Sequence, residues 1–385
     1  MKTVIVSGAL ANKAGQGGES WVRLNWLLGF RELGWDVHFI EQIARETCVD
    51  AAGKPAAFAV SVNRAYFEQV TQEFGFADSA TLIYDGGAEF FGASASQLAT
   101  LAARTDLLVN IGGHLLYEPV FAGVRRRAYV DIDPGFTQFW TAQGNPGAHL
   151  AGHDVFFTVG ENIGSDDCPI PTCDRRWLAT RPPIALHAWP VVSAPQCDRF
   201  TTVASWRGPF GVLEFGGVTY GLKVHEFRKV IALPRRTGQR FAIALNIHPG
   251  DGKDRDALDD HGWNILDPAA TTSDPCAFRR FIHRSGAEFS VAQGIYVQTG
   301  SGWFSDRTAA YLATGKPALV QDTGFSRHLP TGEGLLAFRN EDEAAAGAAG
   351  IATHYERHCR AARRVAEEYF DARRVLSRFL QQLPS

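Results

Sequence analysis

Gly17 and Gly18 stand between a short apolar run, Thr3–Ser7, and an amphipathic stretch that Ser20 is expected to cap. A glycine-rich loop ahead of a helix offers backbone amides and a positive helix end, which together bind phosphate. The G-x-G-x-x-G dinucleotide fingerprint fails here, because Ser20 holds the place of its third glycine. We therefore expect a phosphate-bearing ligand at this loop. Glu41, at the end of the next apolar run, leaves a dinucleotide-dependent dehydrogenase as an alternative interpretation. A second alternative is a surface loop without function.

His114 and Asp133 have side chains suited to proton transfer. His114 follows Gly112-Gly113 at the end of one apolar run, and Asp133 comes just after the run that ends at Asp131. The carboxyl ends of parallel strands meet at one edge of a sheet, which is where α/β proteins bind ligands. Either side chain could act there as a general base. The alternatives are a histidine held by hydrogen bonds and an aspartate that caps a helix.

Arg207 and Lys223 place two positive charges near the start of the second half of the chain. Two cations can neutralise a departing diphosphate without a metal ion, so we interpret them as a diphosphate site. The alternative for each is a solvated surface charge.

The stretch from Ser301 to Phe338 predicts a turn, a helix, a buried strand, a glycine-rich loop and a second strand. Gly315-Lys316-Pro317 ends the helix, whose start is the best anion or sugar-hydroxyl site in the sequence. In the glycine-rich loop, Glu333 is expected to hold ribose hydroxyls. The residues expected at the helix start are Gly302, Ser305, Asp306, Arg307 and Thr308.

The elements that would position these residues alternate between strands and helices in both halves of the chain. Such alternation predicts parallel sheets with helices on both faces. A proline-rich stretch at 164–200 shows neither helical nor strand periodicity and is expected to link two domains. We predict an α/β protein of two Rossmann-like, doubly wound domains that face each other across a cleft. Their predicted bounds are 1–190 and 191–370.

The run from Ala313 to Val320, with the later Thr331-Gly332-Glu333-Gly334, resembles the donor-binding half of the GT-B glycosyltransferases, of the group 1 type. The resemblance implies transfer of a sugar from a nucleotide donor, with Arg207 against the donor diphosphate. It also implies that the last helix, at 371–385, crosses back to the first domain. The retaining branch carries two glutamates at positions that are Gly302 and Ala310 here, so the sequence departs from it.

Composition agrees with a globular protein that acts on small molecules. The 385 residues are 45% hydrophobic and 21% charged, with a formal net charge of −3, which gives no reason to expect nucleic acid or a membrane surface as partner. No apolar run approaches the length of a spanning helix, and we expect a cytoplasmic protein. Six scattered cysteines are expected to be reduced thiols. A zinc site at Cys168 and Cys173 is the less favoured alternative.

The sequence, with the resemblance, thus predicts a glycosyltransferase that uses a nucleotide-sugar donor and a small-molecule or natural-product acceptor. No metal or other cofactor is expected, and a homodimer is left open. His114 or Asp133 would be the base if the enzyme inverts the configuration of the transferred sugar. The alternatives are a sugar-nucleotide epimerase on the same fold and a non-catalytic nucleotide- or sugar-binding protein.

Overall fold

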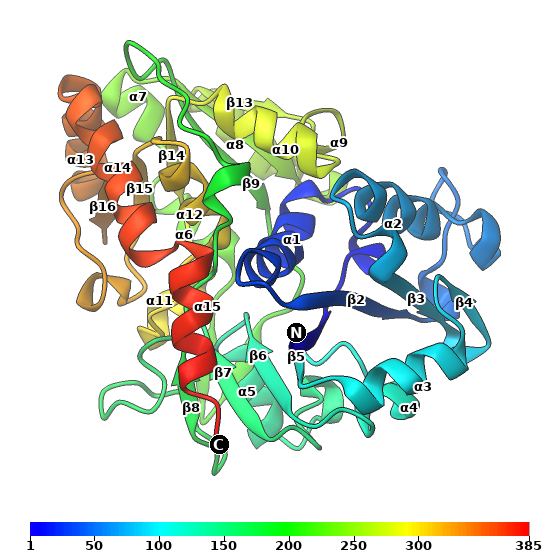
Figure 1. Cartoon of the computed structure of the whole chain (residues 1–385). Coiled ribbons are helices and arrows are strands. Elements are labelled where there is room, and N and C mark those ends of the chain that lie inside the picture. Colours follow the sequence, from blue (N-terminus) through cyan, green and yellow to red (C-terminus); the bar gives the residue numbers. More distant parts are fainter. Residues whose placement is uncertain (385) are drawn as a thin grey trace.

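The computed structural model describes residues 1–384 and shows two α/β lobes, each built on its own sheet (Figure 1). The first sheet has the strand order β4-β3-β2-β1-β5-β6-β7-β8, and every pair is parallel except β3–β4. Its central strands are almost wholly apolar and buried, as strands covered on both faces are. The strands are β1 (Thr3–Ser7), β2 (Asp36–Ile43), β3 (Ala80–Tyr84), β4 (Glu89–Phe91), β5 (Leu107–Ile111), β6 (Arg127–Asp131), β7 (Val155–Thr158) and β8 (Trp177–Ala179).

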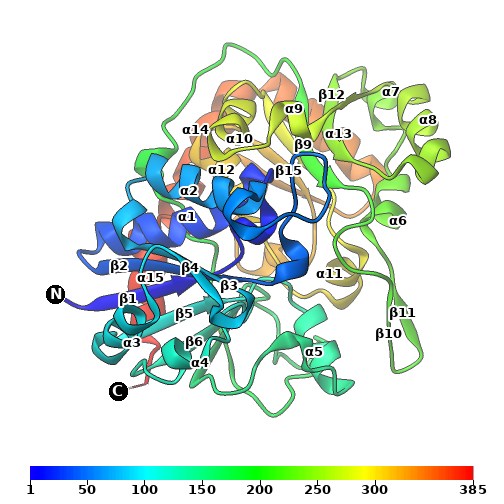
Figure 2. The same ribbon diagram turned by 90° about the vertical axis from the view of Figure 1, so that its right-hand side faces the viewer.

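The second sheet is parallel throughout, in the order β13-β12-β9-β14-β15-β16. Its strands are β9 (Phe200–Ser205), β12 (Phe241–Asn246), β13 (Trp263–Leu266), β14 (Ala287–Ser290), β15 (Ala318–Gln321) and β16 (Leu335–Phe338). A separate antiparallel hairpin, β10 (Leu213–Phe215) and β11 (Val218–Tyr220), leaves this lobe and reaches the first one (Figure 2). It packs on α5 (Phe136–Ala142), where the Phe139 ring lies 4.9 Å from the ring of Tyr220.

Helices cover both sheets. The first lobe has α1 (Gly17–Glu32), α2 (Val62–Glu73), α3 (Ala95–Arg104), α4 (Glu118–Phe121) and α5. The second lobe has α6 (Lys223–Arg228), α7 (Leu233–Thr237), α8 (Gly252–Asp260), α9 (Pro268–Thr271), α10 (Pro275–His283), α11 (Gly294–Thr299), α12 (Asp306–Ala313), α13 (Glu341–Thr353) and α14 (Tyr355–Tyr369). The last helix, α15 (Ala372–Gln381), lies against α1 of the first lobe, and its Phe379 ring packs 5.3 Å from that of Trp26.

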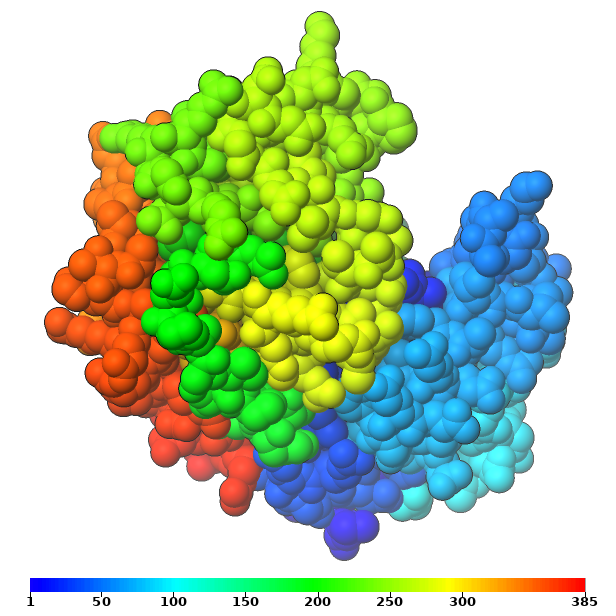
Figure 3. Space-filling model, turned by 90° about the horizontal axis from the view of Figure 1, so that it is seen from above, coloured from blue at the N-terminus to red at the C-terminus, as the bar shows by residue number. Residues whose placement is uncertain are grey.

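The fold class is confirmed, and the two lobes touch along a continuous core. One cluster of buried apolar residues includes Trp21 on α1, Phe278 on α10, Phe304 before α12 and Phe370 before α15. Seen from above, the surfaces of the first lobe (blue) and the second (yellow) touch each other and are separated by a notch at one edge (Figure 3). Across residues 1–384, no helix combines the length and apolar character needed to cross a membrane.

One local expectation was wrong, and one strand was not anticipated. Helix α1 begins at Gly17 rather than after Ser20, because the Gly17 amide donates to the Thr272 carbonyl of the other lobe, 2.9 Å away. The Ser20 hydroxyl lies inside the helix and meets the Tyr66 hydroxyl at 2.8 Å. The stretch 164–200, which shows no strand periodicity in the sequence, also contains the short strand β8, which pairs with β7. Both features depend on residues that are distant in the sequence.

Candidate active site between the two lobes

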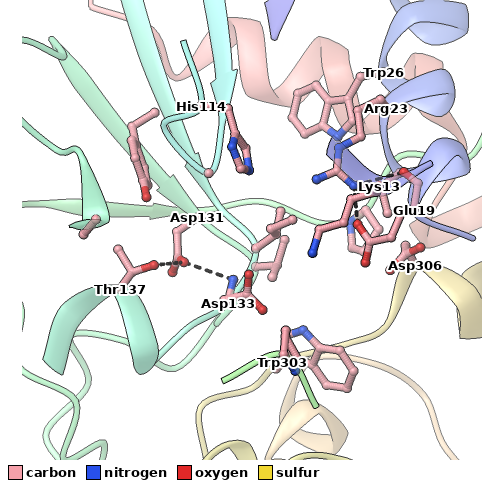
Figure 4. A pocket seen from close by; sticks show the side chains of 18 of the residues that line it. Lys13, Glu19, Arg23, Trp26, His114, Asp131, Asp133, Thr137, Trp303 and Asp306 are labelled. Atoms are coloured by element: carbon pink, nitrogen blue, oxygen red, sulfur yellow. Dashed lines mark hydrogen bonds and ion pairs between the residues drawn. The ribbon is translucent and has the colours of Figure 1, made fainter. Parts of the chain in front are cut away.

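A cavity of about 330 Å³ lies at the carboxyl edge of the first sheet. His114, after β5, and Asp131 and Asp133, after β6, lie on its walls, as the strand-end argument predicts. Their side chains point toward a common space, together with those of Lys13, Glu19, Arg23 and Asp306 (Figure 4). Aromatic side chains complete the wall: Trp26, Tyr129, Trp140, Phe210, Trp303 and Phe304. We call this space the first cavity.

A second cavity, of about 530 Å³, lies between the lobes at the carboxyl edge of the second sheet. Its walls include the start of α1, the ends of β9 and β12 and the start of α12. Gly17 and Gly18 contribute from the first lobe, and Lys223, Ser305 and Arg307 contribute from the second. The starts of α1 and α12 each bring a partial positive charge to this space.

Six residues line both cavities: Glu19, Val22, Asp133, Pro209, Trp303 and Asp306. Three of them are carboxylates, and they come from α1, from the end of β6 and from the start of α12. The two lobes thus bring acidic groups together at the junction of the cavities. A ligand that fills both cavities would have its middle part at these carboxylates.

The first turn of α1 carries an ion pair at this junction. The Arg23 guanidinium, whose side chain is only 2% exposed, lies 2.5 Å from the Glu19 carboxylate. Burial alone would raise the pKa of Glu19, but the charges of Arg23 and Lys13 lower it below its ordinary value. Glu19 is therefore ionised at neutral pH.

The Asp133 carboxylate accepts a 3.0 Å hydrogen bond from the Tyr296 hydroxyl of α11, across the lobe boundary. Burial, followed by the negative charges of Asp131 and Glu19, raises the pKa of Asp133 to about 7. Asp131 is fully buried and accepts hydrogen bonds from Thr137, Gln138 and Thr158. Asp133 is thus a carboxylate that can exchange a proton near neutral pH.

Two further groups of the first cavity titrate at unusual pH. Desolvation, with the nearby charges of Arg23 and Lys13, lowers the pKa of His114 to about 4, so its imidazole is neutral at pH 7. Burial, followed by the negative charge of Glu19, raises the pKa of Asp306 to about 6. Of the two expected bases, Asp133 lines both cavities and His114 lines only the first.

The second cavity contains a nearly buried lysine. Lys223 is 9% exposed, and its ammonium group donates to the Val291 carbonyl at 3.0 Å. Burial, followed by the positive charge of Arg307, lowers the pKa of Lys223 to about 7. Arg307 itself is held by the fully buried Glu288 at 2.6 Å and by Ser290 at 2.7 Å. Lys223 and Arg307 both line the second cavity.

Some of the expected site residues lie elsewhere. Arg207 is turned outward and pairs with Asp251 at 2.5 Å, so the structure does not bring it to the second cavity. Glu333 pairs with Arg357 on the protein surface. Gly302 and Thr308 are buried and line neither cavity. A Cβ at Gly302 would lie 2.9 Å from the Asn162 backbone nitrogen, so this glycine allows the two lobes to approach.

The dehydrogenase alternative loses its key residue. The fully buried Glu41 carboxylate accepts hydrogen bonds from the Ala11 and Asn12 amides, at 2.7 and 2.8 Å. It therefore holds the loop before α1 instead of facing a ribose. The zinc alternative gains nothing either: all six cysteines are free thiols, and within residues 1–384 no group of three or more His, Cys, Asp or Glu side chains is arranged to hold a metal ion.

Lys13, Glu19, Arg23, Tyr296 and Trp303 are site residues that sequence reasoning did not identify. Glu19 and Arg23 stand four residues apart at the start of a helix, a spacing that brings side chains together and could have drawn attention to them. Tyr296 and Trp303 gave no such signal, because their place depends on how the lobes meet.

Comparison with solved structures places this architecture in a known fold. The chain matches an alpha-glucosyltransferase, solved with UDP and a 13-mer DNA, with a TM-score of 0.62 at 12% identity over 99% of this chain and 98% of that one. It matches HepE of Anabaena, solved with UDP and glucose, with a TM-score of 0.60 at 10% identity over 100% of both chains. The chain has the GT-B fold.

A third GT-B structure, the sucrose-phosphate synthase of Thermosynechococcus elongatus, gives a TM-score of 0.58 at 9% identity over 99% of this chain and 98% of that one. By sequence the chain matches no protein-family model and no curated protein. In the GT-B fold of this chain, the second cavity lies between the two Rossmann-like lobes, next to the start of α12.

Proposed function

We propose that the protein is a glycosyltransferase that moves a sugar from a nucleoside-diphosphate sugar to a small-molecule acceptor. The observation that carries the proposal is the pair of cavities that meet at Glu19, Asp133 and Asp306. A donor in the second cavity and an acceptor in the first would bring their reacting atoms together at this junction. The GT-B fold supports the same assignment.

Lys223 and the start of α12 are assigned to the donor diphosphate. Charge develops on this group as the sugar leaves, and a cation in a water-poor site stabilises it strongly. Because Lys223 supplies that charge, we propose that turnover needs no metal ion. Glu19 and Asp306 are assigned to sugar hydroxyls, because hydroxyl groups donate hydrogen bonds that carboxylates accept.

Asp133 is assigned as the general base that takes the proton of the acceptor hydroxyl. Its pKa of about 7 suits a base that works near neutral pH. His114 is assigned to the acceptor, because it lines only the first cavity and is neutral at pH 7. The acceptor class that we propose, a small molecule or natural product, matches the modest volume of that cavity.

The experiment is turnover of UDP-, TDP-, GDP- and ADP-linked sugars in the presence of EDTA, with and without a panel of acceptors. We expect nucleotide release that depends on acceptor and persists in EDTA. Asp133→Asn should lower kcat by about 10²- to 10⁴-fold, the usual contribution of a general base. Asp342→Asn, at a surface carboxylate paired with Arg236, is the matched control and should leave kcat unchanged.

The assay separates the alternatives. An epimerase would convert the donor sugar without any acceptor, and a non-catalytic binding protein would bind a nucleotide without releasing product. A cytoplasmic location is part of the proposal. It is supported by the six free cysteines, which are typical of a reducing compartment.

A further inference from the structure

Tyr296 is a residue of the second lobe whose hydroxyl reaches the proposed base of the first lobe. It lies on α11, is 4% exposed, and donates to Asp133 Oδ1 over 3.0 Å. Within the described residues, this is the sole protein partner of the hydroxyl. Asp133 Oδ2 has no hydrogen-bond partner in the same part of the chain, so one carboxylate oxygen is held and the other is free.

The aromatic ring of Tyr296 is fixed independently of that hydrogen bond. It stacks on Trp303 at a centroid distance of 4.6 Å and an interplanar angle of 27°, and Phe136 meets it edge-on at 6.2 Å. The ring contacts should therefore survive loss of the hydroxyl. Burial raises the pKa of Tyr296 well above 10, so the hydroxyl is a donor throughout the working pH range.

We propose that Tyr296 is a positioning residue that orients the Asp133 carboxylate for proton abstraction from across the lobe boundary. With Oδ1 held from across the boundary, Oδ2 is left to meet the acceptor. The role rests on the proposed function, in which Asp133 is the base.

The groups around Asp133 decide in which direction its pKa moves when the Tyr296 hydroxyl is removed. Burial, Asp131 and Glu19 raise the pKa of this carboxyl, while the Tyr296 hydrogen bond and Arg23 lower it. Lys13, His114 and Asp306 also face the first cavity. A donor hydrogen bond stabilises the charged carboxylate, so its removal should move the Asp133 pKa upward, away from neutral pH.

The test is Tyr296→Phe, which removes one oxygen and keeps the stacked ring. A hydrogen bond to a charged group contributes about 1.5–3 kcal/mol at most, which corresponds to a shift of about one to two pH units. We expect the acid limb of the kcat profile to move to higher pH by about one unit. At pH 6.5 kcat should fall by more than about tenfold. At pH 9, where Asp133 is ionised in both proteins, a smaller loss of kcat should remain because the carboxylate is no longer oriented, while the KM for the donor stays close to that of the unmodified protein.

Tyr355→Phe is the matched control. Tyr355 is also buried, and its hydroxyl donates to the Gly286 carbonyl at 2.7 Å, but it lines neither cavity. This variant loses a buried tyrosine hydrogen bond of the same kind, so it should lower stability and leave the pH profile in place.

A carboxylate titration tests the proposal without relying on turnover. In protein labelled with ¹³C-aspartate, the Asp133 signal is assigned by its loss in Asp133→Asn and then followed with pH. The proposal predicts that this signal titrates about one unit higher in Tyr296→Phe, and a signal that titrates at the same pH would overturn it. Absence of nucleotide binding and turnover would instead contradict the proposed function, whatever the titration shows.

Discussion

Lys223 is the residue in which charge and burial conflict most clearly. Lys223 lines the second cavity, and burial and Arg307 lower its pKa to about 7. A neutral lysine stabilises a bound diphosphate much less than an ammonium ion does. The donor site should therefore work best with Lys223 protonated.

From this follows a pH dependence of nucleotide affinity. Because the lysine is charged below pH 7 and neutral above it, the affinity for a nucleoside diphosphate should weaken as pH rises from 6.5 to 8.5, by about three- to tenfold. Isothermal titration calorimetry at the two pH values measures it. Lys223→Met should bind weakly at both, whereas Lys253→Met, on exposed α8, should keep both the affinity and its pH dependence.

At this scale the sequence predicts part of the site. Asp133 and His114 follow strands of one sheet, and Ser305 lies at the start of α12 as expected, where its hydroxyl accepts a 3.2 Å hydrogen bond from the Arg307 amide. Arg207 lies outside because Asp251, 44 residues later in the chain, holds its guanidinium. A partner at that distance in the sequence leaves no local signal, and the same is true of Tyr296 and Asp133.

Helix α1 is the element on which the site depends most. It carries Glu19 and Arg23, and its start meets the second lobe. Its far side packs on α15, where Gly29 lets the two helices approach. A Cβ at Gly29 would lie 2.6 Å from Leu376 Cδ1 and 2.8 Å from Ala372 Cβ.

Gly29→Ala should therefore destabilise the protein by about 1–3 kcal/mol, the usual cost of an overpacked contact, even though alanine favours a helix. The control is Gly350→Ala in α13, where no atom lies within 4 Å of the new Cβ. There the same change should stabilise by about 0.5–1 kcal/mol. Urea denaturation of both variants gives the two values, and a Gly29→Ala protein as stable as the unmodified one would show that α15 is not packed against α1 as described.

Most elements follow from local pattern. The apolar run Thr3–Ser7 forms β1 with the bounds read from the sequence, and the Asn340 side chain caps α13 by accepting a 2.9 Å hydrogen bond from the Glu343 amide. The hairpin β10–β11 was not predicted, because five glycines between 208 and 221 look like a loop. Its packing on Phe139 and the 2.7 Å bond from Gln143 to the Glu214 carbonyl are contacts between lobes.

At the scale of the molecule, the two lobes form one closed body around the two cavities. Strand alternation in both halves was enough to predict two Rossmann-like lobes. The GT-B fold was predicted from the resemblance of the run from Ala313 to Val320 to that family. The way in which the lobes meet could not be predicted, since contacts such as the 2.8 Å hydrogen bond from Trp21 Nε1 to the Pro275 carbonyl join residues 254 positions apart. The site carboxylates come from both lobes, so the geometry of the site is a property of their closure.

The central claim is that this closed cleft binds a nucleoside diphosphate next to Lys223. The most direct measurement is the thermal unfolding of the protein with UDP, TDP, GDP, ADP and NAD(P)H. A ligand present at a hundred times its Kd adds about 2.7 kcal/mol of stability, which raises the Tm measurably. We predict a rise with one nucleoside diphosphate that is lost in Lys223→Met. No rise with any diphosphate, or a rise with NAD(P)H alone, would contradict the account.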